Sequence, residues 1–377
     1  MRRSDEWYSG LEAVVQDLTD EPLFHFSLGS KELFHSDFLA WFVSAAPEAA
    51  TAVFQPWTSS GETGDSSGAI SVRREKGHLD LLIDVPGMLP LVIENKVFSL
   101  PDETQLADYG TKLPLETSCV LLSLVDPGWV DGATTIGSHR WRYLSYGALA
   151  VAIGDALSIH PPRDPFTADL LCHYRRFCAV LVRLRDLCGI DAQDPQDLVH
   201  LDERALEILR RGRVHDAAQK LRARQIAQLL QQELGRDLHR HVVIGSGYAA
   251  RGNKALLEAF IPVGEPGEPG DKDDLRDWIG WQLEGNQFRL AVQVGDRRLH
   301  SRKDPARRQA REEYVAARYE RYFDFGDLGA VPKSTKGWNG YDPNFVYRYR
   351  LIDGITVGEL ADIVRHFTRR ALHEAEG

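Results

Sequence analysis

The chain has 377 residues, of which 43% are hydrophobic. This composition is enough for one large domain, and usual domain sizes favour two domains. Its net charge of −10 disfavours binding to nucleic acid through overall charge, because phosphate contacts favour Lys and Arg. There is no run of about 18 apolar residues, and acids interrupt the N-terminal segment, so we expect a cytoplasmic protein without membrane contact. Zinc and disulfide frameworks are disfavoured because the four cysteines show no C-x-x-C pairing.

The first part of the chain predicts helices, a loop and a strand. Residues 11–18 favour a short helix, and residues 31–43, KELFHSDFLAWFV, place apolar side chains at a helical period. Residues 56–67 are rich in Ser, Thr and Gly and favour a loop. An alternating strand is expected at residues 70–75, and its last residue, Glu75, suits an exposed edge as well as a nearby site.

A β-hairpin is predicted next. Two apolar runs, residues 79–85 and 91–98, flank the sequence PGMLP, in which proline and glycine favour a turn. Side chains on a strand alternate between faces, so Glu94 and Lys96 point the same way and Asn95 the other. Asp80 is early on the first strand and is expected roughly opposite residues 94–96.

Charged residues on these apolar strands call for a common explanation, because isolated buried charge is costly. A divalent cation supplies one: Asp80 and Glu94, with the carbonyl of Asn95 and waters, would form the oxygen shell that Mg²⁺ prefers. Lys96 would lie beside it, able to orient or deprotonate a water and to stabilise charge on a phosphate. The alternative is a Glu94–Lys96 ion pair on a solvated sheet face, with Asp80 exposed. The apolar context favours the metal site.

A helix is expected after the hairpin. Pro101 and the acids that follow it suit a helix start, since proline fits the first turn and acids complement the positive end of the helix dipole. Gln105 and Tyr109 then share one face at a spacing of four residues.

Taken together, these features resemble the PD-(D/E)XK nuclease superfamily. They are an acid on a first helix, a short strand, G-x-x-D, an apolar strand that ends in I-E-N-K, and a helix with Q-x-x-x-Y. The branch that this chain most resembles has an F-H-S-x-F-L-A-W first helix and the I-E-N-K sequence. The resemblance covers about residues 25–125, and it departs from the superfamily name in having Leu79 where the name has proline.

The resemblance implies a role for each matching residue. Asp80 and Glu94 correspond to the metal-binding carboxylates and Lys96 to the lysine of the motif. Gln105 and Tyr109 correspond to residues of the second core helix. Glu32, near the start of the first helix, corresponds to an accessory acid.

The order of elements in residues 1–160 is also that of the superfamily. Strands are expected at residues 117–125 and 141–144 and a helix at 145–157, which completes the order α, β, β, β, α, β. The resemblance implies an α/β fold with a restriction-endonuclease-like core, a mixed sheet flanked by helices.

The remaining chain predicts a helical connector, residues 161–235, and a C-terminal α+β domain, residues 236–377. The stretch GSGYAARG at 245 is expected to be a loop, and Thr356 suits a helix N-cap. The expected helices are residues 164–188, 205–234 and 356–374, and the expected strands are 241–244, 256–262, 277–283 and 287–294.

Basic residues gather at 204–224 and 297–311, where solvated helix faces are the usual explanation and phosphate binding is the alternative. Aromatic residues beside basic ones mark the C-terminal domain. They suit a core, base stacking or a protein partner, and they are Trp278, Trp281, Trp338, Tyr341, Tyr347 and Tyr349.

The function expected is cleavage of phosphodiester bonds in DNA with Mg²⁺ or Mn²⁺, and the resemblance implies a role in defence against foreign nucleic acid. Two alternatives stay open. One is a nuclease-fold module that cleaves weakly or not at all and binds nucleic acid or protein, which the negative net charge favours. The other is an RNA-directed nuclease. A second copy or a protein partner would bind through the C-terminal domain.

Overall fold

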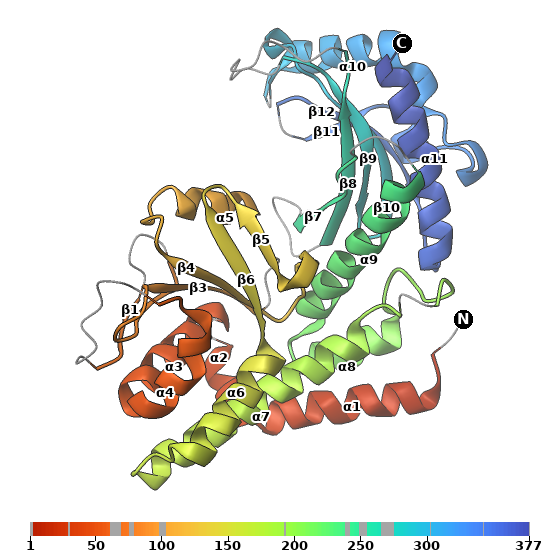
Figure 1. Ribbon diagram of the computed structural model, residues 1–377. Helices are drawn as coiled ribbons and strands as arrows, with labels where there is room; N and C mark the ends of the chain where they lie inside the picture. The colour runs from red at the N-terminus through yellow and green to blue at the C-terminus, as the bar shows by residue number, and fades with distance from the viewer. Residues whose placement is uncertain are drawn as a thin grey trace. The chain divides into compact units, whose positions relative to one another are not determined.

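The computed structural model describes residues 3–28, 31–60, 69–74, 79–97, 103–191, 194–237, 242–248, 255–264, 275–301, 303–341 and 343–376. The chain divides into two compact units (Figure 1). The first unit contains Arg2–Gly189 and Asp202–Leu221, and the second contains Ile190–Leu201 and Arg222–Gly377. Each unit is built on one six-stranded sheet. Within the described ranges, no helix is both long enough and apolar enough to cross a membrane.

The sheet of the first unit is mixed. Its strand order is β1-β2-β3-β4-β6-β5, with β3, β4 and β6 parallel and the other neighbours antiparallel. The predicted hairpin is confirmed as β2 and β3. The strands are β1 (Ser71–Arg74), β2 (Leu81–Asp84), β3 (Leu91–Lys96), β4 (Ser118–Ser123), β5 (Ala133–Ile136) and β6 (His139–Ser145).

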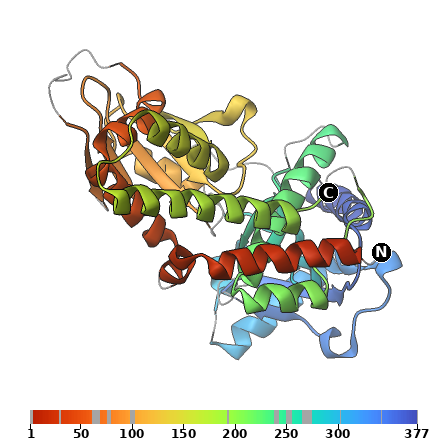
Figure 2. The same cartoon turned by 90° about the horizontal axis from the view of Figure 1, so that it is seen from below.

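Helices flank this sheet, which confirms the predicted α/β class with a mixed sheet. Helix α1 packs along α7 and α8, as Figure 2 shows for α1 and α7. It begins earlier than predicted because Ser4 caps it by accepting a hydrogen bond from the backbone N–H of Trp7. The helices are α1 (Asp5–Asp20), α2 (Pro22–Ser27), α3 (Lys31–Ala45), α4 (Pro47–Phe54), α5 (Glu103–Gly110), α6 (Tyr146–Ile159), α7 (Pro165–Cys188) and α8 (Glu203–Arg211).

The two faces of the sheet carry different side chains. Helix α5 covers one face, where Leu106 and Tyr109 join a core cluster with Val92, Leu121 and Trp141. Helix α3 packs against β3 and α6 against β6, and Asn95 contacts both helices. Since side chains alternate along β3, Val92, Glu94 and Lys96 lie on the α5 face and Asn95 on the opposite face.

The helical tract predicted at residues 205–234 is wrong in one respect, because it is two helices. Helix α8 ends at Arg211, Gly212 caps it, and Arg213 takes a positive φ of 55°. Such a backbone angle cannot continue a right-handed helix. The chain therefore turns before α9 (His215–Asp237) begins.

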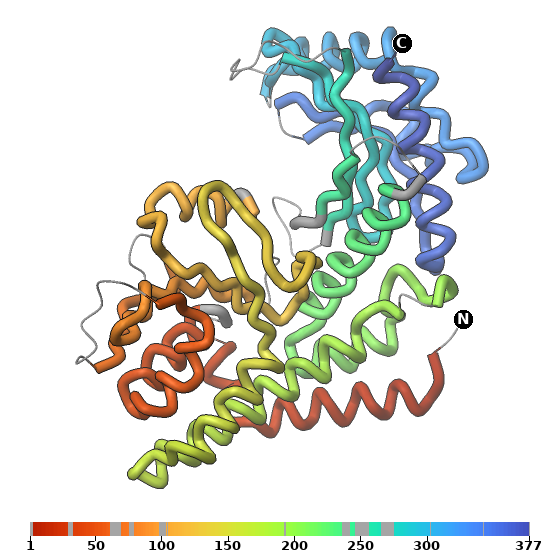
Figure 3. The backbone as a smooth tube through the Cα atoms, in the orientation of Figure 1, coloured from red at the N-terminus to blue at the C-terminus, as the bar shows by residue number. Residues whose placement is uncertain are grey.

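The second unit has an entirely antiparallel sheet in the order β11-β12-β10-β9-β8-β7. Helix α11 packs on β8 and β9, and Figure 3 traces the backbone of both units. The strands are β7 (Gly245–Tyr248), β8 (Ala255–Pro262), β9 (Trp278–Glu284), β10 (Gln287–Gln293), β11 (Asn339–Tyr341) and β12 (Phe345–Leu351), and the further helices are α10 (Pro305–Tyr319) and α11 (Val357–Glu376).

Residues 190–201 belong to the second unit although the next twenty residues do not. Val199 lies in the core of the second unit. The backbone N–H of Val357 donates to the carbonyl of Asp197 over 2.7 Å. Arg222, whose side chain is almost fully buried, forms an ion pair with Asp197 over 2.8 Å and donates to the carbonyl of Leu198. The chain thus enters this unit twice.

Two predictions for the second unit are wrong. The strand expected at residues 241–244 is instead β7, over the glycine-containing stretch that was expected to be a loop. Pairing with β8, in which Gly245 lies opposite Glu258, decides the strand despite poor intrinsic propensity. Of the loop predicted at residues 56–67, residues 61–67 lie outside the described residues.

The terminal helix and one tryptophan follow the predictions. Thr356 caps α11: its hydroxyl accepts from the N–H of Glu359 over 3.1 Å, and the Glu359 carboxylate accepts from the N–H of Thr356 over 2.8 Å. Trp281 is a core residue, fully buried, and its ring N–H donates to Thr368 over 2.8 Å.

Candidate active site

Asp80 and Glu94 lie opposite each other across the hairpin. Strands β2 and β3 pair Leu81 with Ile93 and Leu82 with Val92. Extending this register by one residue places Asp80 opposite Glu94. Residues opposed across an antiparallel pair share a face of the sheet, so both carboxylates lie on the face that α5 covers.

Lys96 lies on the same face and pairs with Glu94. Its Nζ atom is 2.9 Å from Oε1 of Glu94, with side-chain exposures of 11% and 2%. Removing two charges from water costs about as much as their attraction returns, so a buried pair of this kind contributes little to stability by itself.

The carboxylate of Asp80 is held by the main chain of the neighbouring strand. The backbone N–H of Asn95 donates a hydrogen bond of 2.8 Å to Oδ2 of Asp80. A hydrogen bond to a charged acceptor is stronger than one between neutral groups. Asp80 is only half-buried, so this bond fixes an oxygen atom near solvent.

The side chain of Asn95 anchors β3 from the opposite face. Its Nδ2 atom donates to Oγ of Ser36 on α3 over 3.1 Å, and the hydroxyl of Tyr146 on α6 donates to its Oδ1 atom. Two helices thus hold the backbone of the residue between Glu94 and Lys96. Neither Ser36 nor Tyr146 was a predicted site residue; the only hint was that Ser36 lies in the F-H-S-x-F sequence.

His35 packs behind this anchor. It is fully buried, stacks on Phe177 with ring centroids 5.2 Å apart, and its Nδ1 atom is hydrogen bonded to the hydroxyl of Tyr174 over 3.0 Å. Burial lowers the pKa of His35 to about 3. The imidazole is therefore neutral at physiological pH and acts as part of the packing.

Gln105 and Tyr109 extend the cluster from α5. The Nε2 atom of Gln105 donates to the hydroxyl of Tyr109. Burial, followed by the negative charge of Glu94, raises the pKa of Tyr109, and Lys96 and Asp80 also act on it. The hydroxyl therefore lies within electrostatic reach of all three charged residues and stays protonated.

Residues 23–117 match the PD-(D/E)XK nuclease superfamily. This match confirms the resemblance over a segment that runs from α2 to the residue before β4 and includes both carboxylates and the lysine. Comparisons with curated proteins and with solved structures found no match.

PD-(D/E)XK proteins are generally nucleases that use divalent metals, and the residues here fit such an ion. Asp80, Glu94 and the main-chain carbonyl of Asn95 offer the hard oxygen donors that Mg²⁺ and Mn²⁺ prefer. Among the residues that the structure describes, no three His, Cys, Asp or Glu side chains gather into a metal cluster. The side chain of Glu32 on α3 and the whole of Glu75 lie outside those residues, so their predicted roles stay predictions.

Arginines of the two basic segments pair largely with acids that lie close to them in the fold. Arg211 pairs with Glu12 and Arg308 with Glu312, as on solvated helix faces. Arg222 is buried in its unit. These contacts favour solvated helix faces over phosphate binding as the explanation of both segments.

Proposed function

We propose that the chain is a metal-dependent endonuclease that hydrolyses phosphodiester bonds in DNA. The observation that carries the proposal is the placement of Asp80, Glu94 and Lys96 on one face of the sheet, beneath α5, within the PD-(D/E)XK segment. The two carboxylates suit a cation that prefers oxygen ligands, and the lysine suits a phosphate.

Asp80 and Glu94, with the carbonyl of Asn95, would hold Mg²⁺ or Mn²⁺. When bound, the ion supplies a Lewis acid for the phosphate and lowers the pKa of a coordinated water. Lys96, fixed by its ion pair with Glu94, would orient the attacking water and stabilise the negative charge that develops on the phosphate. Glu32 is proposed as an accessory acid of this site.

Tyr109 and Gln105 would position the reacting groups. Because the hydroxyl of Tyr109 accepts from Gln105 and stays protonated, its own proton is available to a phosphate oxygen. The bond between Asp80 and Asn95 keeps one carboxylate in place before substrate arrives, which lowers the reorganisation needed during the reaction.

Cleavage of supercoiled circular DNA by the purified full chain tests the proposal. Reactions with Mg²⁺, Mn²⁺ or EDTA are run for the parent, Glu94→Gln and Lys96→Met. Asp84→Asn is the matched control, because Asp84 ends β2 four residues after Asp80, on the same face, but forms an exposed ion pair with Arg73 over 2.8 Å. We expect metal-dependent nicking by the parent and by Asp84→Asn, and loss of at least about 100-fold in the other two.

Circular substrate is used because an exonuclease cannot begin on it. An RNA circle of the same sequence runs in parallel, and preferential cleavage of RNA would replace DNA as the substrate. If the parent and all folded variants are equally inert on both, the chain is a nuclease-fold module that binds without cleaving.

A further inference from the structure

Helix α11 has a face that the core of the second unit does not use. The buried face of the helix includes Leu360, Val364 and Phe367, and Trp281 of β9 donates a hydrogen bond to Thr368. This packing fixes the rotation of the helix about its axis. The other side chains of its central turns are thereby directed away from the sheet.

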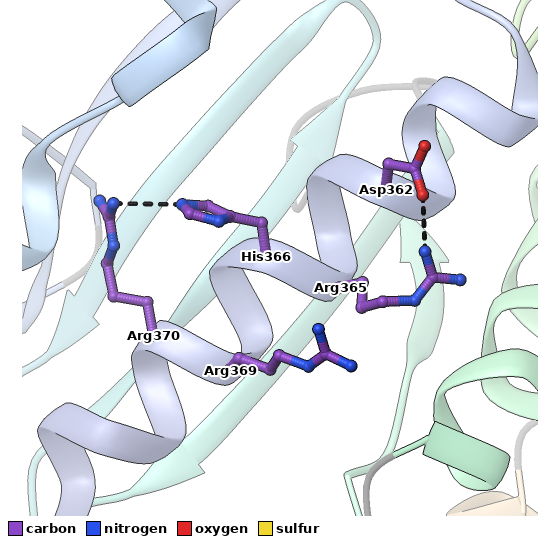
Figure 4. Close-up of a pocket in the computed structure, with 5 residues that line it drawn as sticks. All are labelled: Asp362, Arg365, His366, Arg369 and Arg370. Atoms are coloured by element: carbon purple, nitrogen blue, oxygen red, sulfur yellow. Dashed lines mark hydrogen bonds and ion pairs between the residues drawn. The ribbon is translucent and has the colours of Figure 1, made fainter.

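An open hollow of about 500 Å³ lies along this outward side. Four of its five lining residues are Arg or His, and the fifth is Asp362. Arg365 and Arg369 extend from one side of the helix, and His366 and Arg370 from the other (Figure 4). We call Arg365, His366, Arg369 and Arg370 the α11 basic face. It is formed by one helix within one unit.

The two carboxylates in contact with this face both pair with Arg365. Arg365 lies 2.6 Å from Asp362 and 3.7 Å from Glu233 of α9. Arg370 donates to the main-chain carbonyl of Asp324 and to Nε2 of His366, the latter over 3.1 Å. Neither of these partners is anionic, so the bonds orient the guanidinium without neutralising it.

Two guanidinium charges consequently remain. Within the described ranges, Arg369 makes no hydrogen bond or ion pair, and Arg370 makes no ion pair. In a chain of net charge −10, two arginines without an ion pair beside one hollow offer a local site for an anion. Guanidinium groups present planar sets of donors that match phosphate oxygens.

We propose that the α11 basic face binds the phosphodiester backbone of a nucleic acid strand. Cationic groups on both sides of the helix fit successive phosphates better than a single free phosphate, which one side would satisfy. The proposal takes nucleic acid as the ligand, as the proposed function does, but it concerns a surface in the second unit that is separate from the candidate active site.

The test is binding of fluorescein-labelled DNA by the full chain in EDTA, followed by anisotropy over a range of salt concentrations. The variant is Arg369→Gln with Arg370→Gln. The matched control is Arg298→Gln with Arg307→Gln, which removes two exposed arginines of the same unit that pair with Asp296 and Asp304. For the variant we expect an affinity for DNA that is lower by about tenfold or more on every sequence. We also expect the slope of the logarithm of the binding constant against the logarithm of the salt concentration to be shallower by about 2, because two phosphate contacts are lost.

A variant with the opposite effect guards against misfolding as the cause. Asp362→Asn removes the acid at the edge of the hollow, and we expect it to tighten binding about two- to threefold, which a damaged fold would not do. Equal losses in variant and control, or no binding of DNA by the parent, would overturn the proposal. If millimolar inorganic phosphate saturates the α11 basic face and DNA binding does not change, the ligand of this face is free phosphate instead.

Because EDTA prevents metal-dependent cleavage, this assay is independent of catalysis. If the chain binds DNA through the α11 basic face but never cleaves it, the proposed function is wrong and this inference is supported. If the chain with both arginines replaced cleaves DNA and binds it as well as the parent does, this inference is wrong and the proposed function is supported.

Discussion

The carboxylate of Asp80 accepts a hydrogen bond of 2.8 Å from the backbone N–H of Asn95. One residue is therefore both a candidate metal ligand and a link between two strands, and substitutions can separate the two roles. Asp80→Asn removes the charge but keeps an oxygen acceptor for the N–H, whereas Asp80→Ala removes both.

For this pair of variants we expect equal loss of cleavage and unequal loss of stability. Asp80→Asn should unfold close to the parent in urea, whereas Asp80→Ala should lose about 1–3 kcal/mol because a backbone donor is left unsatisfied. Equal unfolding free energies for the two variants would show that the hydrogen bond is not formed in solution.

Replacing one partner of the Glu94–Lys96 pair should destabilise the fold more than replacing both partners. Lys96→Met leaves a carboxylate that is almost fully buried without its cation, a change that typically costs about 3–5 kcal/mol. Glu94→Gln combined with Lys96→Met should recover most of this stability, because no buried charge remains. Cleavage should be absent in both, and a double variant that is no more stable than Lys96→Met would contradict the buried pair.

The anchor of Asn95 predicts coupling between two helices. Ser36→Ala and Tyr146→Phe each remove one hydrogen bond to the Asn95 side chain, and each should cost about 1–3 kcal/mol in unfolding free energy. Because both act through one side chain, their effects should be non-additive. Thermal unfolding of the two single variants, the double variant and Asn95→Ala measures this, and strict additivity would argue against a shared anchor.

His35 predicts acid sensitivity of the first unit. Its pKa falls from an ordinary value near 6.5 to about 3 in the folded chain. The unfolded chain therefore takes up a proton below about pH 6.5 that the folded chain does not. Stability from this residue is complete above that pH and declines by about 1.4 kcal/mol per pH unit as the pH falls towards 3.

Urea unfolding between pH 7 and pH 4 measures this slope. His35→Gln should reduce this slope by an amount that corresponds to the uptake of close to one proton on unfolding. His160→Gln, which changes an exposed histidine at the end of α6, is the matched control for the loss of one histidine. A parent slope that His35→Gln does not alter would show that the imidazole is protonated in the folded chain.

Much of the candidate site could be predicted because its elements are local. Two apolar runs around PGMLP specify a hairpin, and alternation along its strands then places Asp80 near Glu94 and Lys96. The helix that carries Gln105 and Tyr109 follows from its own start signals. Each of these inferences needs only a short stretch of sequence.

The contacts that support the site could not be predicted because they join distant segments. Ser36 and Tyr146 reach Asn95 across 59 and 51 residues of sequence, and only the packing of α3 and α6 on the sheet brings them together. Strand β7 depends in the same way on its pairing with β8. The α11 basic face became distinct only once the packing on β8 and β9 fixed which side of the helix points outward.

The double entry of the chain into the second unit limits how that unit can be prepared on its own. A fragment that begins at Arg222 lacks Val199 of the core and the backbone partner of Val357. A fragment that begins at Ile190 keeps them but also contains α8, whose apolar residues Ile208 and Leu209 are buried in the first unit. Proteolysis or a single truncation is therefore expected to yield aggregated second units, and separation requires a short linker in place of residues 202–221.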